Sequence, residues 1–422
     1  MSRKRQLRVS LICDNKIREY DSLLLLQEKL RDELHAQVKI FGSIAEIQRI
    51  YFMLHKFQPD VVILPQVQEK SCRELADYVR KSGGIVGVLP SEVTLSDTMV
   101  KTVVNDDTHY DRYVDLFFFP GKDQKKHFLF SDLSASKMFV TGSPKIDVSV
   151  LAAQRQPMSR KEFSTTFQIP LNRKINIFVF TSFPISSEDY QKKDISFSKS
   201  IPFLRMVSKY IRLTKESYLQ MIPLLAGRFS NCNIILKPHP LELVSTYSSL
   251  NVPNLHIVDK ATIHQCFGSI DLAIHWTSTV ASECWINDVK TIQYSPFAEY
   301  DEHLIDLTPG NPLFHTREEL FAGITHYLKH PLEPKYLRFQ RQYLRNNFYL
   351  LDGMSSGRIA SVIKRNLRFH KTKPSYSRGY SYLFFVQHLL DRWLGPVLVR
   401  RIMSSLFRSK SWRYAQLNYL PY

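Results

Sequence analysis

The stretch Asn233-Ile-Ile-Leu-Lys237-Pro-His239-Pro240 decides the fold, together with Asp271-Leu-Ala-Ile-His275-Trp-Thr-Ser278-Thr279-Val-Ala-Ser-Glu283 further along the chain. Each begins with a short apolar run, which is typical of a buried strand, and continues at once into polar side chains. Two adjacent strands that end in this way bring their polar residues together at the carboxyl edge of a parallel sheet, where nucleotide phosphates bind. The pair predicts an α/β enzyme that uses a nucleotide-linked donor.

The bulk composition indicates a folded protein with two domains. A chain of 422 residues is too long for one ordinary core, and its hydrophobic fraction of 44% fits a globular protein. Five scattered cysteines without a Cys-x-x-Cys pair predict buried thiols in a reduced, cytoplasmic compartment. The basic N-terminus leads into a short strand-like run and not into a signal peptide, and no segment has the roughly 18 apolar residues that span a bilayer.

The first part of the chain alternates apolar runs with helical patterns. Because parallel strands need crossover helices, this alternation predicts a doubly wound parallel sheet. We expect helices at 17–35, 44–57 and 72–81. Strands are expected at 7–13, 38–41, 60–65, 84–89, 114–119 and 137–141.

The alternation restarts after a polar stretch at 150–173, which we interpret as the connection between domains. Strands are expected at 174–180, 233–236, 255–258, 272–275 and 291–294, with helices at 202–229, 263–267 and 280–287. The predicted domains are 1–150, an acceptor-side Rossmann-like domain, and 151–370, a nucleotide-donor domain with closing helices. Two Rossmann-like domains facing a cleft form the GT-B architecture of many glycosyltransferases. No Gly-x-Gly-x-x-Gly follows a strand, so no dinucleotide cofactor is expected.

Residues 371–422 form a basic, amphipathic tail in which Gly395-Pro396 separates two helical patterns. From Lys364 onward the chain carries twelve Lys and Arg residues against one acid, Asp391. An apolar face with Trp and Phe flanked by arginines suits a helix lying on the inner, anionic face of the cell membrane. The alternative is a helical pair packed on the protein's own surface. Nucleic-acid binding is disfavoured because the basic residues crowd into the tail and do not interleave with aromatics on a folded face.

Lys237 and His239 are the first candidate phosphate ligands. The flanking prolines stop the strand and project both side chains at its carboxyl end. Both can donate hydrogen bonds to a phosphate, and a protonated His can neutralise a leaving phosphate. The alternative is a capped turn with an incidental histidine.

The second candidate phosphate loop is Thr277-Ser278-Thr279, which opens a helix after a strand. Its hydroxyls act either as helix caps or, with the backbone N–H groups, as a phosphate seat. Glu283, one turn further in, is a candidate acceptor for ribose hydroxyls. Ser182, after the strand at 174–180, and Ser143, in the turn Thr141–Asp147, complete the predicted nucleotide-binding set.

Two carboxylates are candidate general bases or nucleophiles. Glu92 follows the strand at 84–89, with a solvated loop glutamate as the alternative reading. Asp147 follows Thr141-Gly-Ser-Pro and is either catalytic or a helix cap. Arg18 and Glu19 open the first long helix, where Arg18 is placed to clamp an anionic sugar and a surface charge cluster is the alternative.

A metal site is not expected. Asp106, Asp107 and Asp111 have neither a firm strand context nor ligand spacing typical of a metal site.

These motifs resemble the bacterial surface-carbohydrate biosynthesis proteins, which are allied to capsule Kdo transferases, bacterial sialyltransferases and CDP-glycerol glycerophosphotransferases. Within residues 7–365 the resemblance lies in short matches. They are Arg18-Glu-Tyr-Asp-Ser-Leu-Leu-Leu-Leu, Thr141–Asp147, the His-Pro motif Lys237–Pro240, the Ser/Thr motif Ser278-Thr-Val-Ala-Ser-Glu283, and Asp352-Gly-Met-Ser-Ser-Gly-Arg358-Ile-Ala.

The resemblance implies roles for three of these residues. In sialyltransferase-like members the His-Pro and Ser/Thr motifs hold the phosphate of a CMP-sugar, a role carried here to His239, Ser278 and Thr279. Where the family has Asp/Glu-Glu-Gly, this chain keeps only Glu92, and Ser143 and Lys145 replace Asn and Arg.

The function expected on this basis is that of a metal-independent GT-B glycosyltransferase. Its donor would be a CMP-activated Kdo or nonulosonic acid, and its acceptor a surface polysaccharide or lipid-linked oligosaccharide. The alternative is a CDP-glycerol or CDP-ribitol polyol phosphotransferase that uses the same phosphate pocket.

Overall fold

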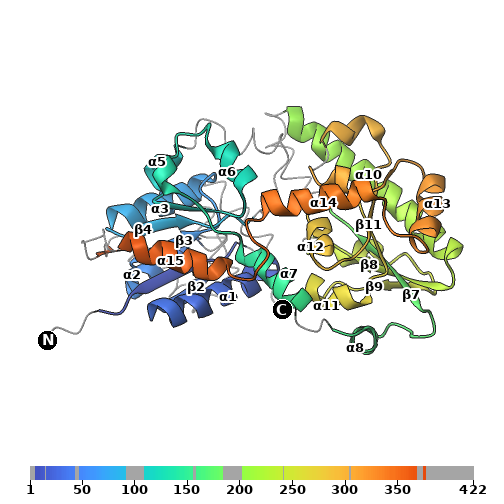
Figure 1. The fold of residues 1–422 in the computed structure, drawn as a ribbon, viewed down its shortest axis with the longest axis horizontal. Helices are drawn as coiled ribbons and strands as arrows, with labels where there is room; N and C mark the ends of the chain where they lie inside the picture. Colours follow the sequence, from blue (N-terminus) through green and yellow to red (C-terminus); the bar gives the residue numbers. More distant parts are fainter. Residues whose placement is uncertain are drawn as a thin grey trace, which may run out of the picture. The chain divides into compact units, whose positions relative to one another are not determined.

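The computed structural model describes residues 5–14, 16–42, 47–91, 109–154, 158–183, 202–240, 242–303, 306–367 and 374–376. The chain forms two compact units (Figure 1). Unit 1 comprises 1–93, 99–148 and 346–422, and unit 2 comprises 94–98 and 149–345. The two-domain α/β fold predicted from the sequence is therefore confirmed.

Unit 1 is built on a six-stranded, all-parallel sheet with the order β2-β1-β3-β4-β5-β6. Every residue of the central strands β3, β4 and β5 is buried, as expected for a parallel sheet covered on both faces. The strands are β1 Arg8–Ile12, β2 Gln37–Phe41, β3 Val61–Leu64, β4 Ile85–Val88, β5 Leu116–Phe119 and β6 Met138–Val140.

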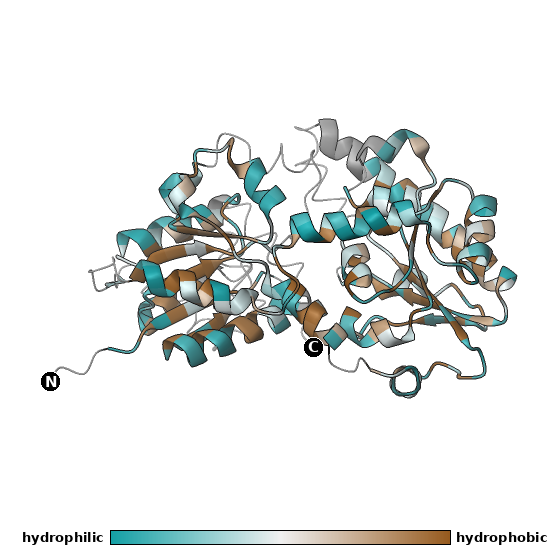
Figure 2. Ribbon diagram, viewed as in Figure 1, coloured by the Kyte–Doolittle hydropathy of each residue, from teal (hydrophilic) through white to brown (hydrophobic). Residues whose placement is uncertain are grey.

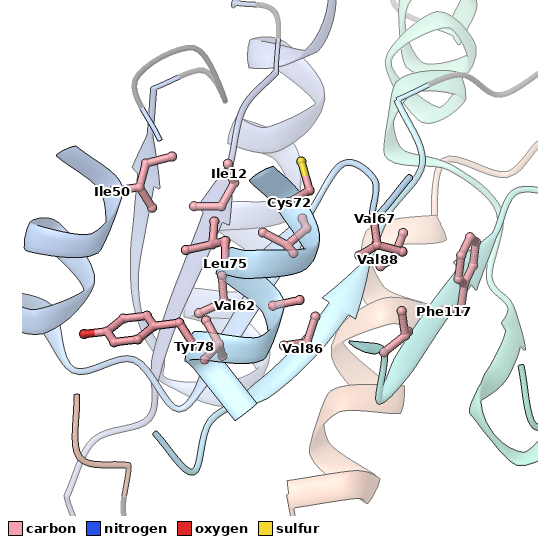
Figure 3. Close-up of a cluster of buried hydrophobic side chains, with 14 of the residues drawn as sticks. Ile12, Ile50, Val62, Val67, Cys72, Leu75, Tyr78, Val86, Val88 and Phe117 are labelled. Atoms are coloured by element: carbon pink, nitrogen blue, oxygen red, sulfur yellow. The ribbon is translucent and has the colours of Figure 1, made fainter. Parts of the chain in front are cut away.

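Helices cover both faces of the unit 1 sheet. On one face, α2 Ile47–Phe57 and α3 Lys70–Lys81 pack with α5 Tyr110–Tyr113 and α6 Lys122–Phe128. Figure 3 shows this core, in which Leu75 of α3 faces Val62 and Val86. The other face packs against α1 Lys16–Leu34 and α15 Ser355–Leu367.

Unit 2 contains a second six-stranded parallel sheet, with the order β12-β11-β10-β7-β8-β9. Read from β9 to β12 and numbered within the unit, the strand order is 3-2-1-4-5-6, which is the arrangement of a dinucleotide-binding fold. The switch point of this sheet lies between β7 and β10. The strands are β7 Ile175–Phe180, β8 Cys232–Lys237, β9 Leu255–Ile257, β10 Leu272–His275, β11 Thr291–Tyr294 and β12 Leu313–Phe314.

The helices of unit 2 form a layer on each face of its sheet, and Figure 2 shows the apolar strands between more hydrophilic helices. One face packs against α10 Pro202–Arg228 and α13 Arg317–Tyr327, with α14 Pro334–Asn347 following. The other packs against α8 Arg160–Thr166, α11 Ile263–Cys266 and α12 Val280–Ile286. No helix in the described part of the chain is long and apolar enough to cross a membrane.

Two features of the chain course differ from the sequence-based expectation. The stretch 150–173 is not a structureless connection, because helix α7 Pro144–Gln154 runs into it and α8 follows. A capping box of Ser159 and Glu162 and a fully buried Phe163 hold α8, which is too short to show a periodic pattern. The closing helix α15, assigned with 151–370 to the second domain, instead packs on α1 of unit 1, because its apolar face completes the core there.

All five cysteines are buried and free, as predicted. Of the predicted tail 371–422, only 374–376 lies within the described residues. There Tyr376 is buried against unit 1, and its hydroxyl donates to the carbonyl oxygen of Pro59 at 3.0 Å.

Candidate functional site

The topology of unit 2 brings three polar loops together at the carboxyl edge of its sheet. The sequence predicted that β8 and β10 are adjacent, but β7 lies between them and pairs with both. His275 is in register with Phe180, and Phe180 with Lys237, so the three strands end level with one another. The loops after them begin side by side at the switch point of the sheet.

The side chain of Lys237 is buried, with 8% of its surface exposed. Its ammonium group donates to the carbonyl oxygen of Asp259 at 3.2 Å, in the loop after β9. Burial lowers the pKa of Lys237 below its usual value, against the opposing effect of nearby acidic groups that include Glu242. The cation is therefore directed toward the β9 loop, and its predicted contact with phosphate stays a prediction.

His239 lies in a tight turn at the end of β8, and its side chain is half-buried. The backbone N–H of Glu242 donates to the carbonyl oxygen of His239 at 2.9 Å. The side chain of Glu242 accepts in return from the backbone N–H of His239 at 3.3 Å. Since Pro240 lies inside this turn and limits its backbone freedom, the turn fixes where the imidazole leaves the sheet.

Glu242 is the functional candidate that the sequence reasoning missed. Only 9% exposed, its carboxylate accepts from the Thr181 hydroxyl at 2.9 Å and from the Phe183 backbone N–H at 2.8 Å. The hydroxyl of Tyr247 also donates to it. Burial raises the pKa of Glu242, and these hydrogen bonds act in the opposite direction. An acid in the turn after the His-Pro pair was the available signal.

An aromatic contact links the β7 loop to the β10 loop. The rings of Phe183 and Trp276 stack with centroids 5.9 Å apart, and both side chains are almost fully buried. Trp276 is followed directly by Thr277-Ser278-Thr279. The Phe183 contact therefore ties the predicted Ser/Thr phosphate loop to the β7 loop that Glu242 holds.

The β10 loop places its hydroxyl groups at the start of α12. The Ser278 hydroxyl accepts from the backbone N–H of Val280 at 3.4 Å, which is a long, capping-type contact. Thr277, Ser278 and Thr279 are all half-buried. Ser182 of the neighbouring β7 loop is also half-buried. The four residues predicted to hold a phosphate thus lie in two adjacent loops of one sheet edge.

The side chain of Glu283 is almost completely buried within unit 2. Its carboxylate accepts from the hydroxyl of Ser149 at 3.1 Å. This contact gives Glu283 a structural partner in unit 2, and its predicted contact with ribose stays a prediction.

His275, at the end of β10, is fully buried beneath the loops. Its Nε2 lies 3.3 Å from the amide oxygen of Asn311. Burial lowers the pKa of His275 to about 4, with the hydrogen bond to Asn311 acting in the opposite direction. The imidazole is therefore neutral at physiological pH and supports the sheet edge without contributing a positive charge.

Unit 1 has its own small hollow at the carboxyl edge of its sheet, at the ends of β1, β3, β4 and β6, and its lining is mainly apolar. Two predicted residues line it, Glu19 and Ser143, together with Ser91 and Lys145. The carboxylate of Glu19 accepts from the backbone N–H of Asp14 at 3.0 Å, and Lys145 donates to the carbonyl oxygen of Ser91 at 3.4 Å. The structure thus brings Glu19 and Ser143 together in unit 1, whereas His239 and Ser278 lie in unit 2.

Asp147 is 1% exposed and caps α15 from helix α7. It accepts from the backbone N–H and the hydroxyl of Ser355, both at 2.7 Å, and from the backbone N–H of Ser356 at 3.3 Å. Burial raises the pKa of this carboxyl group, and the same hydrogen bonds oppose that shift. The contacts give Asp147 a structural role, and its catalytic assignment stays a prediction.

Comparison with solved structures identifies the architecture. MnaA of S. aureus, in a structure with UDP, matches with a TM-score of 0.57 and 13% identity over 88% of this chain and 100% of MnaA. A UDP-N-acetylglucosamine 2-epimerase matches with a TM-score of 0.55 and 14% identity over 88% of this chain and 100% of its own. The wall teichoic acid polymerase TagF matches with a TM-score of 0.55 and 13% identity over 86% of this chain and 89% of TagF.

The chain has the GT-B fold. At these identities the likeness establishes the fold alone. Neither the protein-family models nor the curated proteins give a match to the sequence.

Some predicted residues of this GT-B chain fall outside the description. Glu92, Asp106 and Asp107 are not among the described residues, and for Arg18 only the backbone, within α1, is described. Asp111 is described and forms an ion pair with Lys137 at 3.0 Å. Across the described ranges, no three His, Cys, Asp or Glu side chains are grouped as a metal site would need.

Proposed function

We propose that the protein is a GT-B glycosyltransferase that transfers a sugar from a nucleotide donor to a bacterial surface glycan. The observation that carries the proposal is the level alignment of the β10, β7 and β8 ends at the switch point of unit 2. In open α/β sheets this is where nucleotide phosphates bind. There the chain supplies an imidazole, three hydroxyl-bearing residues in one loop and a serine in the next.

The proposed chemistry assigns the leaving phosphate to unit 2. A protonated His239 would neutralise the charge that develops on this phosphate as the glycosidic bond to the donor breaks. Ser182, Thr277, Ser278 and Thr279 would donate hydrogen bonds to the phosphate oxygens. Lys237 would add positive potential from its buried position.

The acceptor side is assigned to unit 1. There Glu92 or Asp147 would accept the proton of the attacking hydroxyl, or act as the nucleophile. Arg18 and Glu19 would contact the sugar.

The donor proposed is CMP-activated Kdo or a related nonulosonic acid, supported by the resemblance of the His-Pro and Ser/Thr motifs to those of sialyltransferase-like enzymes. The second candidate is a polyol phosphotransferase that uses CDP-glycerol or CDP-ribitol. The fold shared with TagF, a wall teichoic acid polymerase also studied after a soak with CDPG, favours this alternative. Both reactions release CMP, so the donor molecule distinguishes them.

A donor screen tests the proposal. We expect cytidine nucleotides, and CMP above the others, to raise the melting temperature in buffer containing EDTA, because a ligand of the folded state stabilises it. CMP release from a CMP-sugar, and not from CDP-glycerol or CDP-ribitol, would establish the glycosyltransferase. Stabilisation by UDP or GDP without an effect of CMP or CDP would show that the donor assignment is wrong. If the protein converted UDP-N-acetylglucosamine to its 2-epimer, its activity would be epimerisation and the proposed sugar transfer would be wrong.

We further propose that residues 371–422 hold the enzyme on the inner face of the cell membrane. Each basic residue near an anionic surface contributes about 1 kcal/mol, and the apolar face adds to this. Removal of the residues after 376 retains the buried Tyr376. This truncation should release the protein from anionic liposomes, while transfer to a soluble acceptor persists. Liposome binding of the full-length chain should weaken as the salt concentration rises. Equal flotation of both forms would contradict the membrane role.

A further inference from the structure

Glu242 lies where the three loops of the unit 2 site are tied together. We propose that Glu242 is the positioning residue of this site, an inference that rests on the proposed function for its catalytic consequence. It touches the β7 loop through Thr181 and Phe183 and the β8 turn through His239.

The hydrogen-bond pattern requires an acceptor at Oε1, whereas the partners of Oε2 are hydroxyl groups. Oε1 receives the backbone N–H groups of Phe183 and His239, which can only donate. Oε2 receives the Tyr247 hydroxyl, and the Thr181 hydroxyl lies 2.9 Å from both oxygens. An ionised carboxylate satisfies all four donors, and two cations, Lys215 of α10 and Lys237 of β8, act on it electrostatically.

This contact set extends to the Ser/Thr loop. Glu242 fixes the backbone of Phe183, and the Phe183 ring stacks on Trp276 immediately before Thr277. A shift at Glu242 would therefore be felt at His239 directly and at the β10 hydroxyls through one aromatic contact. One buried side chain sets the relative placement of the imidazole and the hydroxyl groups that are proposed to bind the same phosphate.

Substitution by glutamine separates hydrogen-bond geometry from charge. In Glu242→Gln the amide oxygen can occupy the Oε1 position and keep both backbone N–H bonds. Its NH₂ can then donate to the Tyr247 and Thr181 hydroxyls, since a hydroxyl accepts as well as donates. Glu242→Ala removes every acceptor. Tyr247→Phe is the matched control, because it removes a partner of Oε2 and leaves Oε1 intact.

Hydrogen–deuterium exchange tests the positioning without any substrate. In peptides containing the amides of Phe183 and His239, we expect at least about tenfold faster exchange in Glu242→Ala, and near wild-type exchange in Glu242→Gln and Tyr247→Phe. Glu242→Asp, shorter by one methylene, is expected to behave like the alanine variant and serves if that variant does not fold. Unchanged exchange in the alanine or aspartate variant, or equal loss of protection in the glutamine variant, would overturn the inference.

A double-mutant cycle tests the catalytic consequence. Glu242→Ala should lower kcat by about tenfold or more with little change in KM, because a misplaced imidazole weakens transition-state stabilisation. Combined with His239→Ala, it should lower kcat by no more than about twofold beyond His239→Ala alone, since the two changes remove one interaction. Additive losses would show that Glu242 acts on the fold in general, and would overturn the inference.

The two tests also separate this inference from the proposed function. Normal turnover in His239→Ala, combined with the expected exchange pattern, would refute the phosphate role of His239 and leave the loop-positioning role of Glu242 standing.

Discussion

Glu242 of unit 2 and Asp147 of unit 1 are both buried carboxylates at the carboxyl edge of a parallel sheet, and burial raises the pKa of each. Their partners differ. Asp147 accepts hydrogen bonds from two consecutive residues at the start of α15, Ser355 and Ser356. Glu242 receives its bonds from residues in two loops and a 3-10 helix around the proposed phosphate site. The contacts of Asp147 hold one helix end, whereas those of Glu242 link separate loops of the proposed site.

The largest effect is expected for His239→Ala. Loss of charge stabilisation at the leaving phosphate should lower the transfer rate on the order of a hundredfold or more, while the melting temperature stays near wild type. The measurement is turnover with the donor found in the screen. Near-normal turnover would show that His239 does not stabilise the leaving phosphate, and that the loops around Glu242 do not form the proposed site.

Asp147→Ala should lower the free energy of unfolding by about 3 kcal/mol, because it leaves buried N–H groups of α15 without an acceptor. Urea unfolding measures it. Asp147→Asn is the matched control, since its amide oxygen can accept from both backbone N–H groups and the Ser355 hydroxyl can accept from its NH₂. Full stability with lost turnover in Asp147→Asn would reverse the comparison and make Asp147 catalytic.

The buried His275 predicts a pH dependence of stability that originates in unit 2. Its pKa of about 4 in the folded state lies below the usual value of 6.5, so the unfolded chain takes up the proton first. Stability should therefore fall as pH drops below 6.5, by about 2 kcal/mol between pH 6.5 and 5. Burial also lowers the pKa of His256, which adds in the same direction.

Unfolding at both pH values, compared with His275→Gln, isolates the contribution of His275. The raised pKa values of Asp147 and Glu242 act in the opposite sense at lower pH, and they are common to both proteins. An equal pH dependence in wild type and His275→Gln would show that the buried imidazole is not the source.

Gly142→Ala should lower the stability of unit 1 by about 1–2 kcal/mol. Gly142 has φ +81°, and an added Cβ would lie 2.3 Å from the Ser355 hydroxyl oxygen that is bonded to Asp147. Gly227→Ala, in α10, is the control, because its Cβ meets nothing within 4 Å and a gain of about 0.5 kcal/mol is expected. Thermal unfolding measures both variants. An unchanged melting temperature in Gly142→Ala would show that the turn before Asp147 tolerates a Cβ.

Local sequence pattern was sufficient for most strands, because a run such as Val61–Leu64 is buried on both faces and carries no polar residue. It was not sufficient for strand order, so β8 and β10 were expected to be neighbours although β7 lies between them. Order depends on crossovers and not on the residues of one strand. Helix α8 was missed because it is short and the buried Phe163 is its one apolar side chain, so it shows no apolar periodicity.

The site was predictable at its strand ends and not in its connections. Lys237, His239 and Thr277–Thr279 follow apolar runs, which marks them in the sequence. Glu242 stands between two leucines in a loop, and nothing in this local sequence distinguishes it from an exposed loop acid. Its importance comes from its partners in the loop after β7. Asp147 meets Ser355 across a separation of 208 residues, which no local pattern encodes.

Unit 1 is completed only by a segment that follows all of unit 2 in the sequence, which affects how the protein folds during synthesis on the ribosome. Leu23, Leu26 and Leu30 of α1 belong to a core that also contains Ile359 and Ile363 of α15. Until α15 emerges, these leucines lack part of their cover, although all of unit 2 has already been translated. The nascent protein therefore exposes an apolar surface on α1 until α15 has been translated, and unit 1 becomes complete only after unit 2, which lies between its segments in the sequence.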